Sequence, residues 1–235
     1  MTTIRTTPNP VIRWAGRHLH QLNERHPWNH NDHFHPWILA HLPSGAQRVL
    51  DVGCGRGDLL AALRTRCPHV EGIDPDQVMA YHSATRFQQV DGVVVLRTAL
   101  HDLAREESRH GTYDAITMVA SLHHQDLDEA LGDARLLLRP GGRLLVVTLV
   151  EPRGGVDTLW DVANALSNPV IGFVKHPRPA QGGGGDTQMP VSDASWSLAQ
   201  LRERAEIILP GARVRRREGF RVTLRWEKPP AQGAV

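Results

Sequence analysis

Short apolar runs alternate with longer amphipathic segments through the middle of the chain, between residues 46 and 150. The runs have the length of strands and are rich in Val, Leu and Ile, which is typical of strands buried on both faces. The segments between them carry leucines at helical spacing. Regular alternation of this kind predicts a parallel sheet with crossover helices. The expected strands are 48–52, 70–73, 93–96, 113–119 and 143–150, and the expected helices are 58–64, 77–86 and 128–138.

The C-terminal part predicts an antiparallel addition to this sheet. From residue 220 to 226, apolar residues alternate with Arg and Thr, which is the period of a half-buried strand. Val214 lies in the expected partner strand, which is joined through Glu218 and Gly219 and preceded by a helix at 195–208. The predicted fold class is therefore α/β, with a seven-stranded, mostly parallel sheet, helices on both faces and an antiparallel C-terminal hairpin.

Four segments make up the expected single domain. They are an N-terminal helical extension or lid (1–45), a core (46–150), substrate-cap helices with a Gly/Pro-rich loop (151–210) and the C-terminal hairpin (211–228). Further helices are expected at 11–22, 36–42 and 156–166. The Gly/Pro-rich stretch 176–190 is expected to be mobile, because such a composition cannot offset the entropy of ordering the chain.

Composition narrows the class of protein. The chain has 235 residues, a formal net charge of +2 and two cysteines, Cys54 and Cys67. Two cysteines supply no disulfide framework and the N-terminus shows no apolar signal segment, so we expect a cytoplasmic protein. No apolar run has the length that spans a bilayer, so no membrane partner is expected. The arginines between 213 and 225 are expected on the solvent side of two strands, so nucleic acid is not an expected partner.

A glycine-rich turn follows the first expected strand. Gly53, Gly55 and Gly57 lead into the first helix, where the lack of a Cβ lets the backbone turn sharply and approach a ligand. Dinucleotide-binding domains use the same device, but they place Gly or Ala at the position that Asp58 occupies here. The Lys-Ser/Thr pair of a nucleoside-triphosphate loop is missing as well. Asp51, just before the loop, favours a cationic ligand over a pyrophosphate.

The segment Asp51-Val-Gly-Cys-Gly-Arg-Gly57 resembles the first motif of class I S-adenosylmethionine-dependent methyltransferases, in the branch that acts on small molecules. The resemblance implies a Rossmann-like cofactor-binding core over 46–150. It also implies S-adenosyl-L-methionine as cofactor and S-adenosyl-L-homocysteine as product. It assigns Asp51 to the amino group of the methionine moiety, and Asp74 with Pro75 to the ribose hydroxyls. The other implied cofactor residues are Gly53, Cys54, Gly55, Gly57, Thr98, Ala99, Leu100, Ala120 and Ser121.

Two further aspartates have other interpretations. This chain lacks the Gly-Asp pair that the family usually carries after the third strand, so Asp102 either binds the adenine amine or caps a helix. Asp76 is expected to be the N-cap of the helix that follows it.

Ser121-Leu-His123-His124 follows the fourth expected strand, at the end where open α/β sheets bind ligands. Family members that methylate amino groups of adenine or cytosine carry Asn or Asp with a Pro-Pro-aromatic run here, so that branch is disfavoured. An imidazole can remove the proton of an acceptor hydroxyl. We expect His123 or His124, with preference for His123, to be the general base. A histidine that only packs or binds backbone is the alternative.

A histidine-rich segment precedes the first expected strand. It is similar to a stretch found in some small bacterial methyltransferases and suggests a lid over the cofactor. The expected lid and acceptor residues are Trp28, His30, His33, Phe34 and Trp37, with Trp160 opposite. A metal site is the alternative, because His and Asp bind zinc. The spacing matches no closed structural site and no cysteine joins it, so no metal is predicted.

Together these patterns predict a methyltransferase that transfers a methyl group in line to oxygen or nitrogen of a small molecule, in specialised metabolism. Three alternatives stay open. One is an RNA-directed methyltransferase that uses the Arg-rich hairpin, the second is a cofactor-binding protein without transfer activity, and the third is a nicotinamide dehydrogenase. No motif falls in 1–45 or 151–210, so the sequence predicts neither the acceptor nor an oligomeric state.

Overall fold

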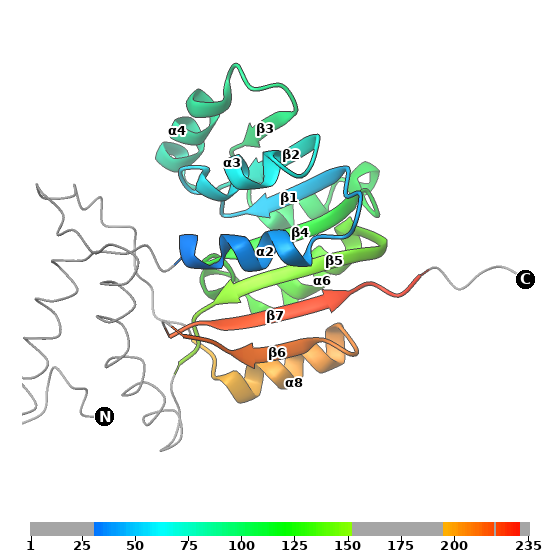
Figure 1. The fold of residues 1–235 in the computed structure, drawn as a ribbon. Coiled ribbons are helices and arrows are strands. Elements are labelled where there is room, and N and C mark those ends of the chain that lie inside the picture. The colour runs from blue at the N-terminus through cyan, green and yellow to red at the C-terminus, as the bar shows by residue number, and fades with distance from the viewer. Residues whose placement is uncertain (1–30, 152–194, 219, 231–235) are drawn as a thin grey trace, which may run out of the picture. The chain divides into compact units, whose positions relative to one another are not determined.

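The computed structural model describes residues 31–151, 195–218 and 220–230, and these form one sheet with helices on both faces (Figure 1). Apart from residues 218 and 220, they belong to one compact unit. The strands are β1 (Arg48–Val52), β2 (His69–Ile73), β3 (Val93–Leu96), β4 (Tyr113–Val119), β5 (Leu138–Thr148), β6 (Arg213–Arg216) and β7 (Val222–Glu227). The helices are η1 (Asp32–Phe34), α2 (His35–His41), α3 (Asp58–Arg64), α4 (Gln77–Phe87), α5 (Leu100–Ala104), η2 (Glu107–Arg109), η3 (Leu122–His124), α6 (Leu127–Leu137) and α8 (Leu198–Ile208).

The strands follow the order β3-β2-β1-β4-β5-β7-β6. The first five are parallel, and β7 pairs antiparallel with both β5 and β6. The predicted fold class is therefore confirmed, including the C-terminal hairpin that completes the sheet. The helices expected at 11–22 and 156–166 and the stretch 176–190 lie outside the described residues. None of the described helices is long and apolar enough to cross a membrane.

Alternate residues of each central strand face two separate cores. On β5, Leu144 and Val146 pack with α5, α6 and α8, whereas Leu145 and Val147 pack with η1, α2, α3 and the end of α4. Because both faces of the sheet are covered, its central strands are mostly apolar, which is the nearly continuous pattern that the sequence shows.

The segment before β1 belongs to the second of these cores. Phe34 and Ile38 are buried there beside Leu60 of α3. The Arg143 side chain of β5 donates from Nη1 to the carbonyls of His41 and Leu42 at 3.1 and 3.3 Å. These carbonyls end α2 without partners in the helix, so the arginine both satisfies them and holds α2 against the sheet.

Several element boundaries differ from the prediction. β5 begins at Leu138 rather than 143, and the Pro-Gly-Gly stretch lies inside the strand instead of forming a turn before it. The register of β5 against β4 shifts between Tyr113 and Ala115, and Gly141 has a φ of 75° there. Phe220 lies in the turn before β7 with a φ of 60°, so β7 begins at Val222.

The two expected helix caps have different outcomes. Asp76 caps α4, because its carboxylate accepts from the amides of Val78 and Met79 at 2.8 and 2.9 Å. Asp102 lies inside α5 and is exposed, so its assignment as an N-cap is wrong; the position before α5 is Ala99.

The arginines of the hairpin are less uniformly exposed than predicted. Arg213 and Arg215 are exposed, but Arg221 is half-buried and donates from Nη2 to Asn31 Oδ1 at 3.1 Å. Burial lowers the pKa of Arg221 to about 10. Arg221 is therefore a half-buried contact between the hairpin and Asn31, ahead of η1.

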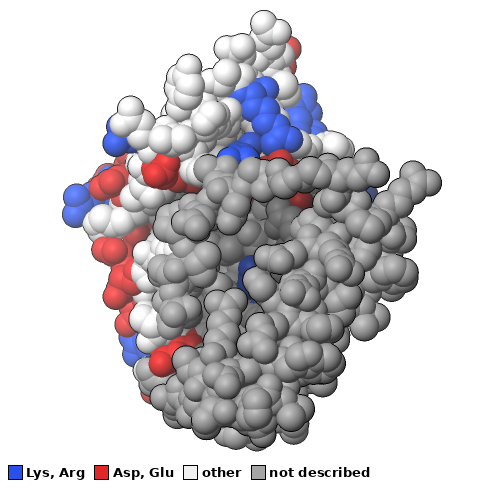
Figure 2. All heavy atoms as spheres, turned by 90° about the vertical axis from the view of Figure 1, so that its left-hand side faces the viewer, with Lys and Arg blue, Asp and Glu red and all other residues white. Residues whose placement is uncertain are grey.

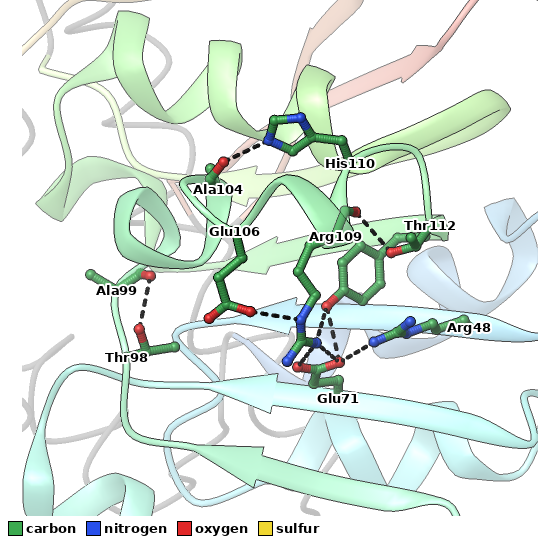
Figure 3. Close-up of polar contacts among 10 residues, drawn as sticks. Arg48, Glu71, Thr98, Ala99, Ala104, Glu106, Arg109, His110 and Thr112 are labelled. Carbon is green, nitrogen blue, oxygen red and sulfur yellow. Dashed lines mark hydrogen bonds and ion pairs between the residues drawn. The ribbon is translucent and has the colours of Figure 1, made fainter.

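The buried carboxylate of Glu71 connects the residues that begin β1 and β4. Glu71 of β2 is 6% exposed and accepts from Arg109 at 2.6 and 2.9 Å, from Arg48 at 3.0 Å and from the Tyr113 hydroxyl at 2.9 Å. Figure 3 shows Arg48 and Arg109 converging on Glu71 from different elements. Burial and the charge of Glu71 raise the pKa of Tyr113 to about 12. A buried charge needs this many partners because its hydration has been lost.

We expect Glu71→Ala to lower the free energy of unfolding by about 2–4 kcal/mol, because it leaves two guanidinium groups and a buried hydroxyl without their acceptor. Glu106→Ala is the matched control. Glu106 binds the same Arg109 at 3.0 Å from a mostly exposed position, so its loss should cost less than about 1 kcal/mol. Urea unfolding of both variants measures the difference. Equal losses would show that Glu71 contributes no more than a surface ion pair.

Candidate functional site

The glycine loop lies at the edge of the sheet where β1, β2 and β4 end. Its backbone turns back onto β2, because the amides of Gly53 and Cys54 both donate to the carbonyl of Ile73, at 2.8 and 3.0 Å. Gly53, Gly55 and Gly57 have φ values of 70°, 52° and 79°. These left-handed conformations are strained for residues with a Cβ, which accounts for the three glycines.

The three glycines differ in what surrounds them. A Cβ on Gly53 would overlap Ser121 Cβ, and one on Gly57 would lie 2.5 Å from the Phe87 ring and 2.6 Å from Ser83 Oγ. A Cβ on Gly55 would meet no atom of the described residues within 4 Å. The sequence interpretation gave all three glycines one purpose, the close approach of a ligand. In the structure, two of them make room for the protein's own side chains, and Gly55 alone faces open space.

Asp74 follows β2 and connects to the same loop. It is 7% exposed, and its two carboxylate oxygens accept from the amides of Gly55 and Asp76, each at 2.9 Å. Each oxygen keeps a further lone pair, so the group can still accept a hydrogen bond from a ligand. Pro75, beside it, is exposed.

Asp51 is the most deeply placed acidic residue of the site. It is 3% exposed, and its Oδ1 accepts from the Thr117 hydroxyl at 2.7 Å. Burial raises the pKa of Asp51 to about 7; the Thr117 hydrogen bond opposes this shift and the charge of Asp74 adds to it. Burial also raises the pKa of the Cys54 thiol in the adjoining loop, so Cys54 is a neutral packing residue here. A cation close to Asp51 would favour its ionised form.

The segment expected to contact adenine lies after β3. Leu100 begins α5 and is 2% exposed in the core, whereas Thr98 and Ala99 are half-buried. The Thr98 hydroxyl donates to the Ala99 carbonyl at 3.4 Å (Figure 3). Thr98 and Ala99 are thus the members of this group that keep exposed surface.

The loop after β4 passes directly beside the glycine loop. Ala120 has a φ of 56°, a strained conformation for alanine. The Ser121 hydroxyl donates to the Val52 carbonyl at 2.5 Å, at the end of β1. The end of β4 is therefore held against the end of β1, and the strained residue lies at their junction.

The two histidines that follow differ sharply in environment. His123 is 7% exposed, and its Nδ1 is buried with no hydrogen-bond partner among the described residues. His124 is exposed, and its ring centre lies 4.1 Å from that of His123. Burial lowers the pKa of His123 to about 4, and positive charges on His124 and Arg221 act in the same direction. His123 is therefore neutral at physiological pH, and its Nδ1 remains without a hydrogen-bond partner in the described part of the chain.

The expected lid residues are only partly described. Trp28, His30 and Trp160 lie outside the described residues. Phe34 is a core residue of η1, while His33 and Trp37 are half-buried beside it. The Trp37 ring lies 4.7 Å from that of His41, and its Nε1 is buried without a partner in the described part of the chain. The same part of the chain contains no group of three His, Cys, Asp or Glu residues that could hold a metal ion.

Sequence reasoning missed two residues beside the site, Thr117 and Arg221. Thr117 is a polar residue in an otherwise apolar part of β4, so a polar position in a strand buried on both faces could have singled it out. Arg221 was interpreted as a solvent-facing strand residue, and no local pattern distinguishes it from its neighbours.

We expect Gly53→Ala to lower the free energy of unfolding by about 2–4 kcal/mol, because its Cβ overlaps Ser121 in addition to the strain of a positive φ. Gly55→Ala should cost only about 1–2 kcal/mol, since the added Cβ meets no atom of the described part of the chain and the backbone strain remains. Thermal or urea unfolding of the two variants tests the order. A Gly55→Ala protein less stable than Gly53→Ala would contradict it.

Comparisons with known proteins identify the family. A family model described as a methyltransferase domain matches residues 17–178. A methyltransferase of Mycobacterium bovis is 36% identical over 212 residues, a match that covers 86% of this chain and 98% of the relative. A ubiquinone biosynthesis O-methyltransferase of Marinobacter nauticus is 34% identical over 118 residues, which covers 48% of each chain.

Solved structures show the same fold at lower identity. The phosphoethanolamine N-methyltransferase 2 of Haemonchus contortus, in complex with phosphomonomethylethanolamine and S-adenosylhomocysteine, is 18% identical with a TM-score of 0.53. The match covers 78% of this chain and 38% of that one. The family match and the Mycobacterium bovis relative identify a methyltransferase rather than a nicotinamide dehydrogenase. The chain belongs to the class I S-adenosylmethionine-dependent methyltransferase family.

Proposed function

We propose that the protein methylates oxygen or nitrogen of a small-molecule acceptor, and that His123 receives the proton which the acceptor loses. The observation that carries this proposal is a buried, neutral His123 beside Ser121, at the sheet edge that also holds Asp51, Gly55 and Asp74. Open α/β sheets bind their ligands at this edge.

The cofactor residues fit a ligand that carries positive charge and hydroxyl groups. Asp51 offers a desolvated carboxylate, whose ionised form an ammonium group would stabilise. Asp74 is held by two backbone amides and offers its remaining lone pairs to ribose hydroxyls. Gly55, whose amide binds Asp74, would place an added Cβ within 4 Å of no described atom. Thr98 and Ala99 are proposed to contact the adenine, with Leu100 supporting them from the core.

Methyl transfer requires the protein mainly to position the acceptor and the cofactor relative to each other. When bound, the cofactor supplies a methyl group that its sulfonium already activates, so holding the acceptor in line and excluding water accounts for much of the rate. The buried Nδ1 of His123 can accept a hydrogen bond from an acceptor hydroxyl or amine. Because burial lowers the pKa of His123 to about 4, the imidazole is neutral at physiological pH but a weak base, so it takes the proton only as the forming bond to the methyl group makes the acceptor acidic. His33 and Trp37 are proposed to bound the acceptor from α2 and the turn before it.

Two observations favour a small acceptor over RNA. The ubiquinone biosynthesis O-methyltransferases, at 34–38% identity over about half of the chain, act on a small molecule as their name states. Where described residues are visible, at the margin of the view in Figure 2, acidic and basic side chains lie together. A polyanion is bound more commonly by a continuous basic face.

The test is methyl transfer from radiolabelled S-adenosylmethionine to three sets of acceptors, namely phenols, small amines and bulk tRNA. We expect label in the phenol or amine set and none in tRNA, because the site offers one buried base and mixed surface charge. Transfer to tRNA that weakens steeply with added salt would overturn the small-molecule proposal and favour an RNA-directed enzyme.

We expect His123→Ala to lower kcat on the acceptor found in this way by about 10²–10⁴-fold, since general-base catalysis contributes this much. His124→Ala is the matched control, because His124 is adjacent but exposed and its loss should leave turnover close to that of the wild type. Calorimetric binding of S-adenosylhomocysteine should be unchanged in both variants. Unchanged turnover of His123→Ala would eliminate His123 as the base.

A further inference from the structure

Thr117 faces the carboxylate of Asp51 from the neighbouring strand. The two residues are partners in the parallel register of β1 and β4, so their positions relative to each other are set by the backbone of the sheet. Thr117 is fully buried, and its Oγ1 lies 2.7 Å from Asp51 Oδ1 and 3.3 Å from the Leu50 carbonyl. The Thr117 side chain therefore connects the Asp51 carboxylate to a backbone carbonyl of β1, the strand that carries Asp51.

A hydroxyl in this position can serve both protonation states of Asp51. It has one proton to donate and two lone pairs to accept with. When Asp51 is ionised, the hydroxyl donates to the carboxylate. When Asp51 is protonated, the acid can donate to Thr117 Oγ1, which then turns its own proton to the Leu50 carbonyl. Neither state leaves the hydroxyl unsatisfied in the buried sheet.

The electrostatic surroundings make this hydrogen bond matter for Asp51. Within the described residues, the pKa of Asp51 is shifted by Asp74 after β2 and by Thr117 on β4, and the neutral Cys54 thiol of the glycine loop is itself under the charge of Asp51. Burial and Asp74 both favour the protonated acid, whereas the Thr117 hydrogen bond favours the ionised one. Thr117 thus opposes the two influences that would remove the negative charge from the site.

We propose that Thr117 is a positioning residue which orients the Asp51 carboxylate and keeps it ionised for the amino-acid end of the cofactor. The inference rests on the proposed role of Asp51 in holding that group. It assigns no contact between Thr117 and the cofactor, because Asp51 lies between them in this role.

The test compares two probes that differ only at the amino-acid end. S-adenosylhomocysteine carries the amino-acid group, and 5′-methylthioadenosine has the same adenosine and a neutral thioether sulfur but lacks it. We expect Thr117→Val to weaken S-adenosylhomocysteine binding about tenfold at pH 7 and to leave 5′-methylthioadenosine binding nearly unchanged, since a hydrogen bond to a charged group is lost. Thr117→Ser, which keeps the hydroxyl, should retain the affinity of the wild type for both probes.

A pH series separates this role from a purely structural one. In the wild type, affinity for S-adenosylhomocysteine should fall as the pH drops through about 7, as Asp51 becomes protonated. In Thr117→Val the fall should begin at higher pH, because the acid has lost the partner that stabilises its ionised form. If the Val variant does not fold, Thr117→Ala supplies the same comparison.

The outcomes distinguish a failure of this inference from a failure of the proposed function on which it rests. Equal weakening of both probes, or a pH profile that does not move, would overturn the role of Thr117. Asp51→Asn tests the proposed role of Asp51 itself. If it leaves the ratio of the two affinities unchanged, the assignment of Asp51 fails and the inference fails with it. If Asp51→Asn changes that ratio and Thr117→Val does not, only Thr117 is excluded.

Discussion

The parallel register of β1 between β2 and β4 is the constraint on which the site depends. It places Asp51 level with Gly72 on one side and Thr117 on the other. Because parallel strands end at the same edge of the sheet, the loops that follow them start close together. The Ser121 hydroxyl and the amides of Gly53 and Cys54 then link these loops to neighbouring strands. Main-chain pairing in the middle of the sheet thus fixes side chains at its edge.

Close packing against protein atoms, rather than ligand binding, accounts for several of the glycines. Gly72 lies inside β2, where a Cβ would come within 2.7 Å of Leu60 and 3.0 Å of the Cys54 sulfur. It allows α3 and the glycine loop to lie directly against the strand. The same close approach operates at Gly53 and Gly57, so the glycine motif is as much a packing motif as a binding motif. Gly55 differs from these two, because an added Cβ there would meet no described atom within 4 Å.

Burial governs the chemistry of the two ionisable residues at this edge in opposite directions. It raises the pKa of Asp51 and lowers that of His123, so both groups favour their neutral forms. A raised pKa in a carboxyl means that the folded state binds more protons than the unfolded state between the two pKa values. Stability therefore falls as the pH rises from about 4 to about 7, and Asp51 costs stability above that range.

The sequence by itself determined the mostly parallel sheet, the helices on both faces, the hairpin and the family, because apolar periodicity and the Asp51–Gly57 motif are local patterns. The tertiary structure decided what no local pattern encodes. It showed that Gly53 and Gly57 face protein atoms, that Pro-Gly-Gly before residue 143 lies inside β5, and that His123 is buried while its neighbour His124 is exposed. It also brought Thr117 to Asp51 across 66 positions of the chain. Such contacts depend on which strands are neighbours and in what register, and that is settled only when the whole sheet has formed.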